Sequence, residues 1–245
     1  MFKKKVLVYT AVGGPNLKYC ELVQLLHKSL RLHHSKNSVD FAVICSEKHW
    51  DQLDIDEIHL NPFDNTSDYY NEFQPHPDDC TLASANSLII QKFDIFHDYD
   101  TIMFLDADII VCKPLSELFD LVQPGLFHAK QEGDLYDLRK KLHSVIVHST
   151  SAEELEQLKS ENIQTINAGT FMFQPSDEIE NTLNDIHTAW LSNYMLAFDP
   201  DKEKTTKVGH GSSAEQVYLN DHLIFKQRHL LEYELFGRKP GKMHL

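Results

Sequence analysis

The chain has 245 residues, of which 42% are hydrophobic and 24% are charged, and this composition is typical of a globular domain with a substantial core. Lys and Arg number 23 against 37 Asp and Glu, so the formal net charge is −14. These values exclude disordered and fibrous proteins, and they exclude a broad basic surface for nucleic acid or anionic lipid.

Cysteine usage and hydropathy indicate the compartment. The four cysteines lie far apart and form no C-x-x-C pair, which favours reduced thiols and a cytoplasmic location. The apolar run from Val6 to Val12 is too short for a signal-peptide core. No segment approaches the roughly 20 apolar residues that a bilayer span requires, so we expect no membrane span.

The first part of the chain alternates between strand and helix patterns. The run from Val6 to Val12 predicts a strand buried on both faces that stops at Gly13. A helix is expected next, with Asn16 as a candidate N-cap. Two further strands are predicted at Val39–Cys45 and Asp56–Leu60. The apolar face of the helix is predicted to contain four leucines: Leu22, Leu25, Leu26 and Leu30.

The middle of the chain predicts a long surface loop and then an interior strand. Residues 61–80 carry Pro, Asn, Asp and aromatic residues without periodicity, which is typical of a functional loop. An amphipathic helix is expected over Thr81–Phe96, followed by a strand at Thr101–Leu105. Pro114 is expected to start a short helix, and two more helices are predicted at Leu135–Val147 and Ser151–Ser160.

The last third predicts a second apolar region and two helices. Asn162–Ser176 contains two apolar runs around Asn167-Ala168-Gly169, and residues 199–213 form a polar loop before a helix over residues 214–223. No linker composition or internal repeat appears, so we expect one domain spanning residues 1–245. Strands alternating with helices predict an α/β fold with a Rossmann-like, mostly parallel sheet flanked by helices. A long helix in between has an apolar stripe made by Ile179, Leu183, Ile186, Trp190 and Tyr194.

The acidic pair Asp106 and Asp108 stands out by its context. In so acidic a chain, two acids separated by one residue arise by chance about five or six times. This pair, however, ends the most apolar interior strand and precedes another apolar run. Two carboxylates placed there repel each other and lose hydration unless a cation or strong hydrogen-bond donors neutralise them. Because open α/β sheets bind ligands beyond the carboxyl ends of their strands, the pair predicts Mg²⁺ or Mn²⁺ beside a phosphate. The alternative is that one Asp caps the following turn and the other is solvated.

Three motifs occur in a recognisable order. They are FLDADIIVCKPLSELFD (Phe104–Asp120), INAGTFMFQPS (Ile166–Ser176) and GSSAEQVYLN (Gly211–Asn220). They resemble the metal-binding D-x-D segment, the N-A-G strand and the "DQ" helix start of the glycogenin-like retaining glycosyltransferases, family 8. The resemblance implies a GT-A fold and retaining transfer of a sugar from a UDP-sugar donor to an acceptor hydroxyl.

The resemblance also implies the roles of individual residues. Asp106 and Asp108 would hold Mn²⁺, or Mg²⁺, together with the donor diphosphate. His244 is the candidate third metal ligand, although the family's downstream Lys-Pro-Trp is absent. Gln216 is expected near the reacting face of the donor sugar, and Glu215 on sugar or acceptor hydroxyls. The residues expected to bind the UDP-sugar are Thr10, Ala11, Tyr19, Lys92, Asp106, Ala107, Asp108, Asn167, Ala168 and Gly169.

Several of these residues have a simpler structural interpretation. Tyr19 is also suited to packing, and Lys92 to a solvated helix face. Asn167 is also suited to capping a bulge or turn, the pair Glu215–Gln216 to helix capping, and His244 to a terminal tail.

Three functions from different classes stay open at this point. The first is the Mn²⁺-dependent retaining transferase, acting by front-face attack on a glycan, protein or small-molecule acceptor. The second is a nucleotide-sugar or carbohydrate-binding module without catalysis. The third is an NDP-sugar nucleotidyltransferase, but Gly13-Gly14-Pro15 is too poor in glycines and cations for its phosphate loop. We expect no nucleic acid partner, and a homodimer is allowed.

Overall fold

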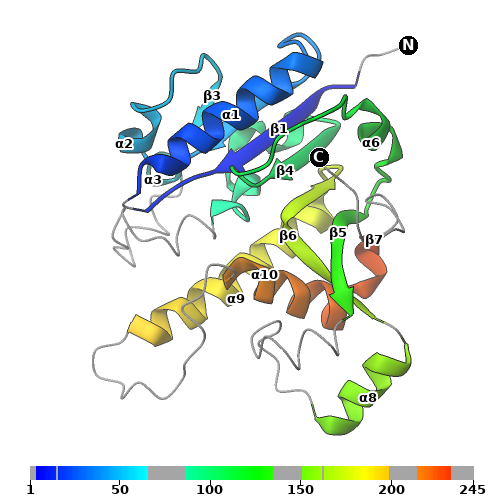
Figure 1. Ribbon diagram of the computed structural model, residues 1–245. Coiled ribbons are helices and arrows are strands. Elements are labelled where there is room, and N and C mark those ends of the chain that lie inside the picture. The colour runs from blue at the N-terminus through cyan, green and yellow to red at the C-terminus, as the bar shows by residue number, and fades with distance from the viewer. Residues whose placement is uncertain are drawn as a thin grey trace.

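A seven-stranded sheet organises the protein (Figure 1). The computed structural model describes residues 4–14, 16–65, 86–134, 151–161, 163–198 and 214–232. The strand order is β3-β2-β1-β4-β6-β5-β7, and β6 runs antiparallel to both of its neighbours while the other four pairings are parallel. The predicted mostly parallel α/β sheet is therefore confirmed. The strands are β1 (Val6–Ala11), β2 (Asp40–Ile44), β3 (Ile58–Leu60), β4 (Thr101–Leu105), β5 (Phe127–Asp134), β6 (Gln164–Phe173) and β7 (Leu231–Glu232).

The central strands are buried on both faces, which explains their continuous apolar runs. In β1, Leu7 and Tyr9 pack into one apolar cluster, while Val6 and Val8 pack into another on the opposite face. This alternation is the two-residue period of a strand. The strands β1, β2 and β4 therefore lie within one or two residues of their predicted bounds.

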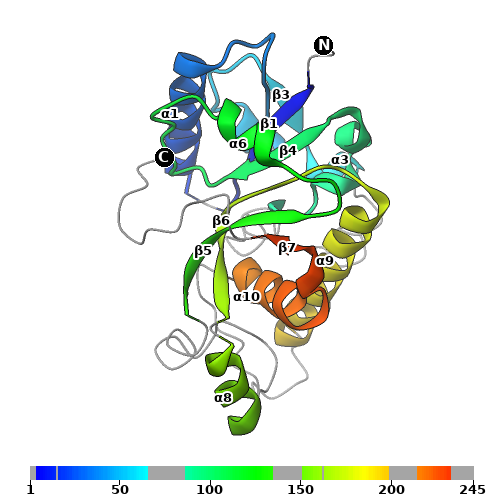
Figure 2. The same ribbon diagram turned by 90° about the vertical axis from the view of Figure 1, so that its right-hand side faces the viewer.

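Helices cover both faces of the sheet, and Figure 2 shows α1 and α9 on opposite sides of it. The long helices are α1 (Lys18–His33) and α9 (Asp177–Phe198). None of the helices in the described ranges is long and apolar enough to cross a bilayer. The shorter helical elements are α2 (Glu47–Trp50), α3 (Pro62–Asn65), α6 (Ser116–Leu121), α8 (Ala152–Ser160), α10 (Ala214–Asn220), the 3₁₀ turns η1 (Ile90–Lys92), η2 (Asp94–Asp98) and η4 (Arg228–Leu230), and the π-helical η3 (Asp221–Lys226).

The buried face of α1 differs from the prediction. Leu25 is 51% exposed, and Asn16 lies one residue before the N-cap position, where its Oδ1 accepts a hydrogen bond from the Lys18 N–H at 3.1 Å. The face toward the sheet is rotated because the smaller side chains Cys20 and Val23 contribute to it. Its buried members are Cys20, Val23, Leu26, Ser29 and Leu30.

The helix predicted over Thr81–Phe96 is wrong from residue 87 onward. Residues 90–98 form the 3₁₀ turns η1 and η2. Phe93 separates them, because its backbone is extended at φ −99° and ψ 139°. Ile90, Phe93 and Phe96 all reach the apolar cluster that residues of α9 also form, so the burial expected of the helix is kept although the backbone differs.

Other predictions differ in extent or lie outside the described residues. β3 begins two residues later than predicted, and Asn162–Ser176 contains one continuous strand, β6, in place of two runs. The helix predicted at Leu135–Val147 and the loop 199–213 lie outside the described residues. Of the loop predicted over residues 61–80, residues 62–65 form the short helix α3, and residues 66–80 lie outside the described part. The extent of the single domain stays a prediction.

Candidate active site

The two aspartates follow the carboxyl end of β4. The Asp106 N–H donates a hydrogen bond to the Gly169 carbonyl at 2.9 Å, and the Asp106 carbonyl accepts one from the Ile109 N–H at 3.0 Å. The chain thus turns immediately after the strand, and both carboxylates remain accessible to solvent. Even so, the surrounding protein desolvates Asp106, and this burial together with the charge of Asp108 raises the pKa of Asp106 to about 6. The pair therefore has the electrostatic character of a cation site.

The backbone of Gly169 on β6 packs closely against the Asp106 carboxylate. A Cβ on Gly169 would lie 2.3 Å from Asp106 Oδ2 and 3.0 Å from Asp106 Cγ. Only glycine leaves room for the carboxylate in this position, because any other residue would displace it. The N-A-G segment and the D-x-D segment therefore meet through this contact.

The pairing between β5 and β6 is interrupted at the N-A-G segment. Ala129 pairs with Phe171, but the next residue, Lys130, pairs with Asn167, so the three β6 residues 168–170 have no partner on β5. Asn167 partly compensates, because its Oδ1 accepts a hydrogen bond from the Gly169 N–H at 3.0 Å. This is the local capping role that formed the structural alternative for Asn167, and it leaves the backbone of Ala168 open to contact from α10.

Gln216 makes that contact. Its Oε1 accepts a hydrogen bond from the Ala168 N–H at 3.4 Å, and its Nε2 donates one to Glu132 on β5. Glu132 is the extra residue of a second irregularity, because Gln131 pairs with Ile166 and Gly133 with Thr165. The Gln216 side chain thus links α10 to β5 and to β6. Its β6 contact, Ala168, is the neighbour of Gly169, which lies against Asp106.

Asn220 fixes α10 against β6. Its Oδ1 accepts a hydrogen bond from the Ile166 N–H at 2.8 Å, and its Nδ2 donates to the Ile166 carbonyl at 3.1 Å and to the Gln216 carbonyl at 2.8 Å. Asn220 is fully buried. Because it lies four residues after Gln216 on the same helical face, it determines where Gln216 meets the strand.

The remaining predicted residues have different surroundings. The register of Tyr9 with Phe104 places the end of β1, with Thr10 and Ala11, at the same sheet edge as the start of the D-x-D segment. Thr10 is fully buried, and its hydroxyl has no hydrogen-bond partner among the described residues. Ala11 and Ala107 are half-buried, and Tyr19 is 48% exposed on α1.

Lys92 faces α9. Burial lowers its pKa while the charge of Glu180 opposes that shift, and Lys92 in turn contributes to lowering the pKa of His187. These electrostatic neighbours belong to α9. The side chain of Glu215, and His244 altogether, lie outside the described residues.

Sequence reasoning missed Glu132 and Asn220. Asn220 had a usable signal, because a polar residue four positions after Gln216 on a short helix indicates a shared face. Glu132 had none, since its place depends on a strand irregularity that no local pattern reveals.

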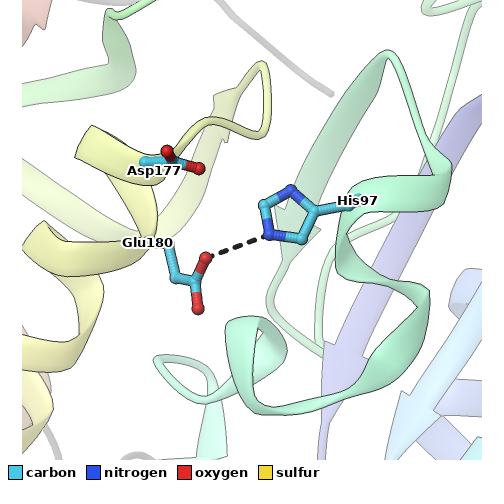
Figure 3. Close-up of side chains that lie close together, drawn as sticks. All are labelled: His97, Asp177 and Glu180. Carbon is cyan, nitrogen blue, oxygen red and sulfur yellow. Dashed lines mark hydrogen bonds and ion pairs between the residues drawn. The ribbon is translucent and has the colours of Figure 1, made fainter.

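A second group of possible metal ligands lies elsewhere. His97, Asp177 and Glu180 each offer a ligand atom, all within 4.8 Å of one another (Figure 3). His97 Nε2 lies 3.0 Å from Glu180 Oε2, which links η2 to the first turn of α9. The helix dipole favours acidic residues in that turn. This hydrogen bond and the dipole account for the group without a metal.

Comparisons with known proteins point to one family. The profile of glycosyl transferase family 8 matches residues 16–202. A search of curated protein sequences found no match. Among solved structures, galactosyltransferase LgtC in complex with donor and acceptor sugar analogues is 14% identical, with a TM-score of 0.52, over 93% of this chain and 72% of that one.

Two further structures have the same fold. Mouse xyloside xylosyltransferase 1 in its apo form is 14% identical, with a TM-score of 0.50, over 95% of this chain and 85% of that one. The bifunctional glycosyltransferase WbbM is 15% identical, with a TM-score of 0.52, over 95% of this chain but only 39% of its own. At these identities the structural matches establish the fold alone.

Proposed function

Because the chain belongs to glycosyltransferase family 8 and has its GT-A fold, we propose that it transfers a sugar from a UDP-sugar to an acceptor hydroxyl with retention. The observation that carries this proposal is the carboxylate pair. Asp106 and Asp108 end an interior strand, and Gly169 leaves the space that the Asp106 carboxylate occupies. The proposed acceptor is a glycan, a protein or a small molecule. A single domain, a cytoplasmic location and a homodimer are further parts of the proposal.

The residues present fit a divalent cation. Asp106 and Asp108 offer the hard oxygen ligands that Mn²⁺ and Mg²⁺ prefer. Desolvation and the charge of Asp108 raise the pKa of Asp106, so a cation would relieve a repulsion that the protein itself leaves in place. We propose that the two aspartates hold Mn²⁺, or Mg²⁺, with His244 as third ligand. When bound, the ion stabilises negative charge on the departing UDP.

The other residues of the site are proposed to bind and orient the donor. Gln216 lies at the reacting face of the donor sugar, and Glu215 hydrogen-bonds sugar or acceptor hydroxyls. Asn167, Ala168 and Gly169 line the sugar side of the aspartate pair. At the uridine side, the proposed residues are Thr10, Ala11, Tyr19 and Ala107, with Lys92 toward the phosphates. Support for Thr10 comes from its buried hydroxyl, which has no partner in the described ranges.

We favour front-face attack as the route to retention. The acceptor oxygen forms the new bond to the anomeric carbon, the bond from that carbon to the UDP oxygen breaks, and the acceptor proton passes to the departing phosphate. Two aspartates that bind a cation are poor nucleophiles, because their charge is already engaged. The Glu132 carboxylate beside Gln216 is likewise engaged, because it accepts a hydrogen bond from the Gln216 amide. These engaged carboxylates support the front-face route over double displacement.

The proposal is tested with the full chain and a panel of UDP-sugars. We expect Mn²⁺-dependent hydrolysis or transfer with at least one of them. Asp106→Asn and Asp108→Asn are each expected to abolish turnover and metal-dependent UDP binding. Asp177→Asn is the matched control, because it removes an exposed acid from the other candidate cluster, and it should retain both. Wild-type turnover in either site variant would defeat the proposal, and UDP binding without turnover in the wild type would favour the non-catalytic module.

A further inference from the structure

The amide of Gln216 is held in one orientation by two partners of opposite character. Its oxygen accepts from the Ala168 N–H, and its nitrogen donates to the Glu132 carboxylate. A backbone N–H cannot accept, and an ionised carboxylate cannot donate. Rotating the amide by 180° would therefore break both hydrogen bonds. It would place the amide nitrogen against the Ala168 N–H and the amide oxygen against the Glu132 carboxylate.

Glu132 is placed for this contact by the backbone. It is the unpaired extra residue between two β5–β6 pairs, and a bulge of this kind redirects a side chain. The side chain is exposed to solvent. Among the described residues Gln216 is the hydrogen-bond partner that the Glu132 carboxylate finds. The regular β5–β6 pairing is therefore interrupted at Glu132, and its carboxylate accepts a hydrogen bond from Gln216.

The backbone of Gln216 is already fixed without Glu132. Asn220 accepts from and donates to Ile166, and it also holds the Gln216 carbonyl. The position of α10 thus depends on Asn220, whereas the rotation of the Gln216 amide depends on Glu132 and the Ala168 N–H. An amide nitrogen carries two hydrogens, so one N–H of Gln216 is held by Glu132 and the second is left for a substrate oxygen.

We propose that Glu132 is a positioning residue that orients the Gln216 amide, so that its second N–H faces an oxygen of the donor sugar. This inference rests on the proposed transfer function and assigns the orientation of its reacting-face residue to a carboxylate on β5. Glu132 acts through Gln216, and removal of its carboxylate leaves the amide orientation to the longer of the two hydrogen bonds, the 3.4 Å contact from the Ala168 N–H.

Kinetics of the full chain test the positioning role. Glu132→Ala is expected to lower kcat about tenfold or more, since misplacement of a group at the reacting centre is costly, with KM for the UDP-sugar unchanged. Glu132→Gln should retain kcat within about twofold, because its amide oxygen still accepts from Gln216. Glu153→Ala removes an exposed carboxylate from α8 and should leave kcat unchanged. Wild-type kcat in Glu132→Ala, or an equal loss in Glu132→Gln, overturns the proposal.

Thermal unfolding tests the contact independently of any activity. Gln216→Glu places two carboxylates face to face and is expected to lower Tm by about 2 °C. Combining it with Glu132→Gln should restore Tm, because the amide introduced at position 132 then donates to the carboxylate at position 216. A double variant no more stable than Gln216→Glu refutes the contact. If the wild type turns over no UDP-sugar while the double variant regains Tm, the proposed function fails and the contact stands.

Discussion

Replacing Gly169 with Ala probes the meeting point of the two central motifs. The new Cβ would lie 2.3 Å from Asp106 Oδ2, where ordinary van der Waals contact begins at 3.4 Å. The oxygen must therefore retreat by about 1 Å, and a displacement of that size at a reacting centre can cost on the order of 10²-fold in rate. We expect turnover of the UDP-sugar to fall by about that factor, and Mn²⁺ affinity to fall with it.

The same substitution should change stability little. The atom that must move is the end of a side chain, and an off-rotamer side chain costs about 0.5–1.5 kcal/mol. Alanine in place of glycine restricts the unfolded chain and regains about 0.4–1 kcal/mol. These terms nearly cancel, so Tm should stay within a few degrees of the wild-type value. A large loss of function with a small change of Tm distinguishes this mechanism from general unfolding.

Three measurements check this reasoning. Electron paramagnetic resonance follows Mn²⁺ binding, a hydrolysis assay follows turnover, and thermal unfolding follows stability. The control is Gly169→Ala in an Asp106→Ala background, where the carboxylate that meets the new Cβ is absent. There the stability change should lose the steric cost that Asp106 causes, while the 3.0 Å approach to Asn167 Oδ1 remains. Wild-type Mn²⁺ affinity and turnover in Gly169→Ala, or the same steric cost in both backgrounds, would refute the argument.

Three other predictions concern stability. Asp106→Asn should raise Tm at pH 7.5 without metal. Folding raises the pKa of Asp106 to about 6, so the wild-type fold loses stability as pH rises from about 4 to 6, and the neutral Asn avoids this loss. An unchanged or lower Tm in the variant contradicts this. Burial lowers the pKa of His187 to about 3, so the unfolded chain binds the extra proton below about pH 6.5 and stability falls on acidification. His187→Phe should flatten the slope of unfolding free energy between pH 6 and 4 in urea titrations, and an unaltered slope counts against the assignment. Asn220→Ala leaves the Ile166 N–H and carbonyl unpaired and should cost about 2–4 kcal/mol in urea unfolding, so a loss under 1 kcal/mol would show that water replaces the side chain.

The sequence predicted well the elements whose burial leaves a continuous local pattern. β4 was predicted at its observed bounds, because a strand buried on both faces has no polar positions. The region around Phe93 was predicted as one helix, because buried apolar residues at short spacing do not distinguish an α-helix from two 3₁₀ turns. The extended backbone at Phe93 is set by packing under α9, which is a tertiary effect. The exposure of Leu25 has the same origin, since the sheet selects the buried face of α1.

The site was predictable to the extent that its residues are adjacent in sequence. Asp106 and Asp108 were predicted to follow a strand end, and they do so in the structure. The role of Gly169 in donor binding stays a prediction, and the group that lies against Gly169 in the structure is the Asp106 carboxylate. Glu132 lies 84 residues from Gln216. Only the bulge in β5 brings the two together, and one extra residue in a strand leaves no periodic trace.

Two acidic clusters, both within the described residues, differ in what balances their charge. At the first turn of α9, Glu180 has the imidazole of His97 at 3.0 Å and the helix dipole beside it. At the end of β4, both influences on Asp106, desolvation and the charge of Asp108, act against ionisation. A cation therefore gains more binding free energy at Asp106 and Asp108 than at the α9 cluster. At the end of β4 it relieves a repulsion between two carboxylates, whereas at α9 it competes with the existing partners of Glu180. This asymmetry explains why two chemically identical substitutions are expected to differ: Asp106→Asn should abolish Mn²⁺ binding, whereas Asp177→Asn should leave it unchanged.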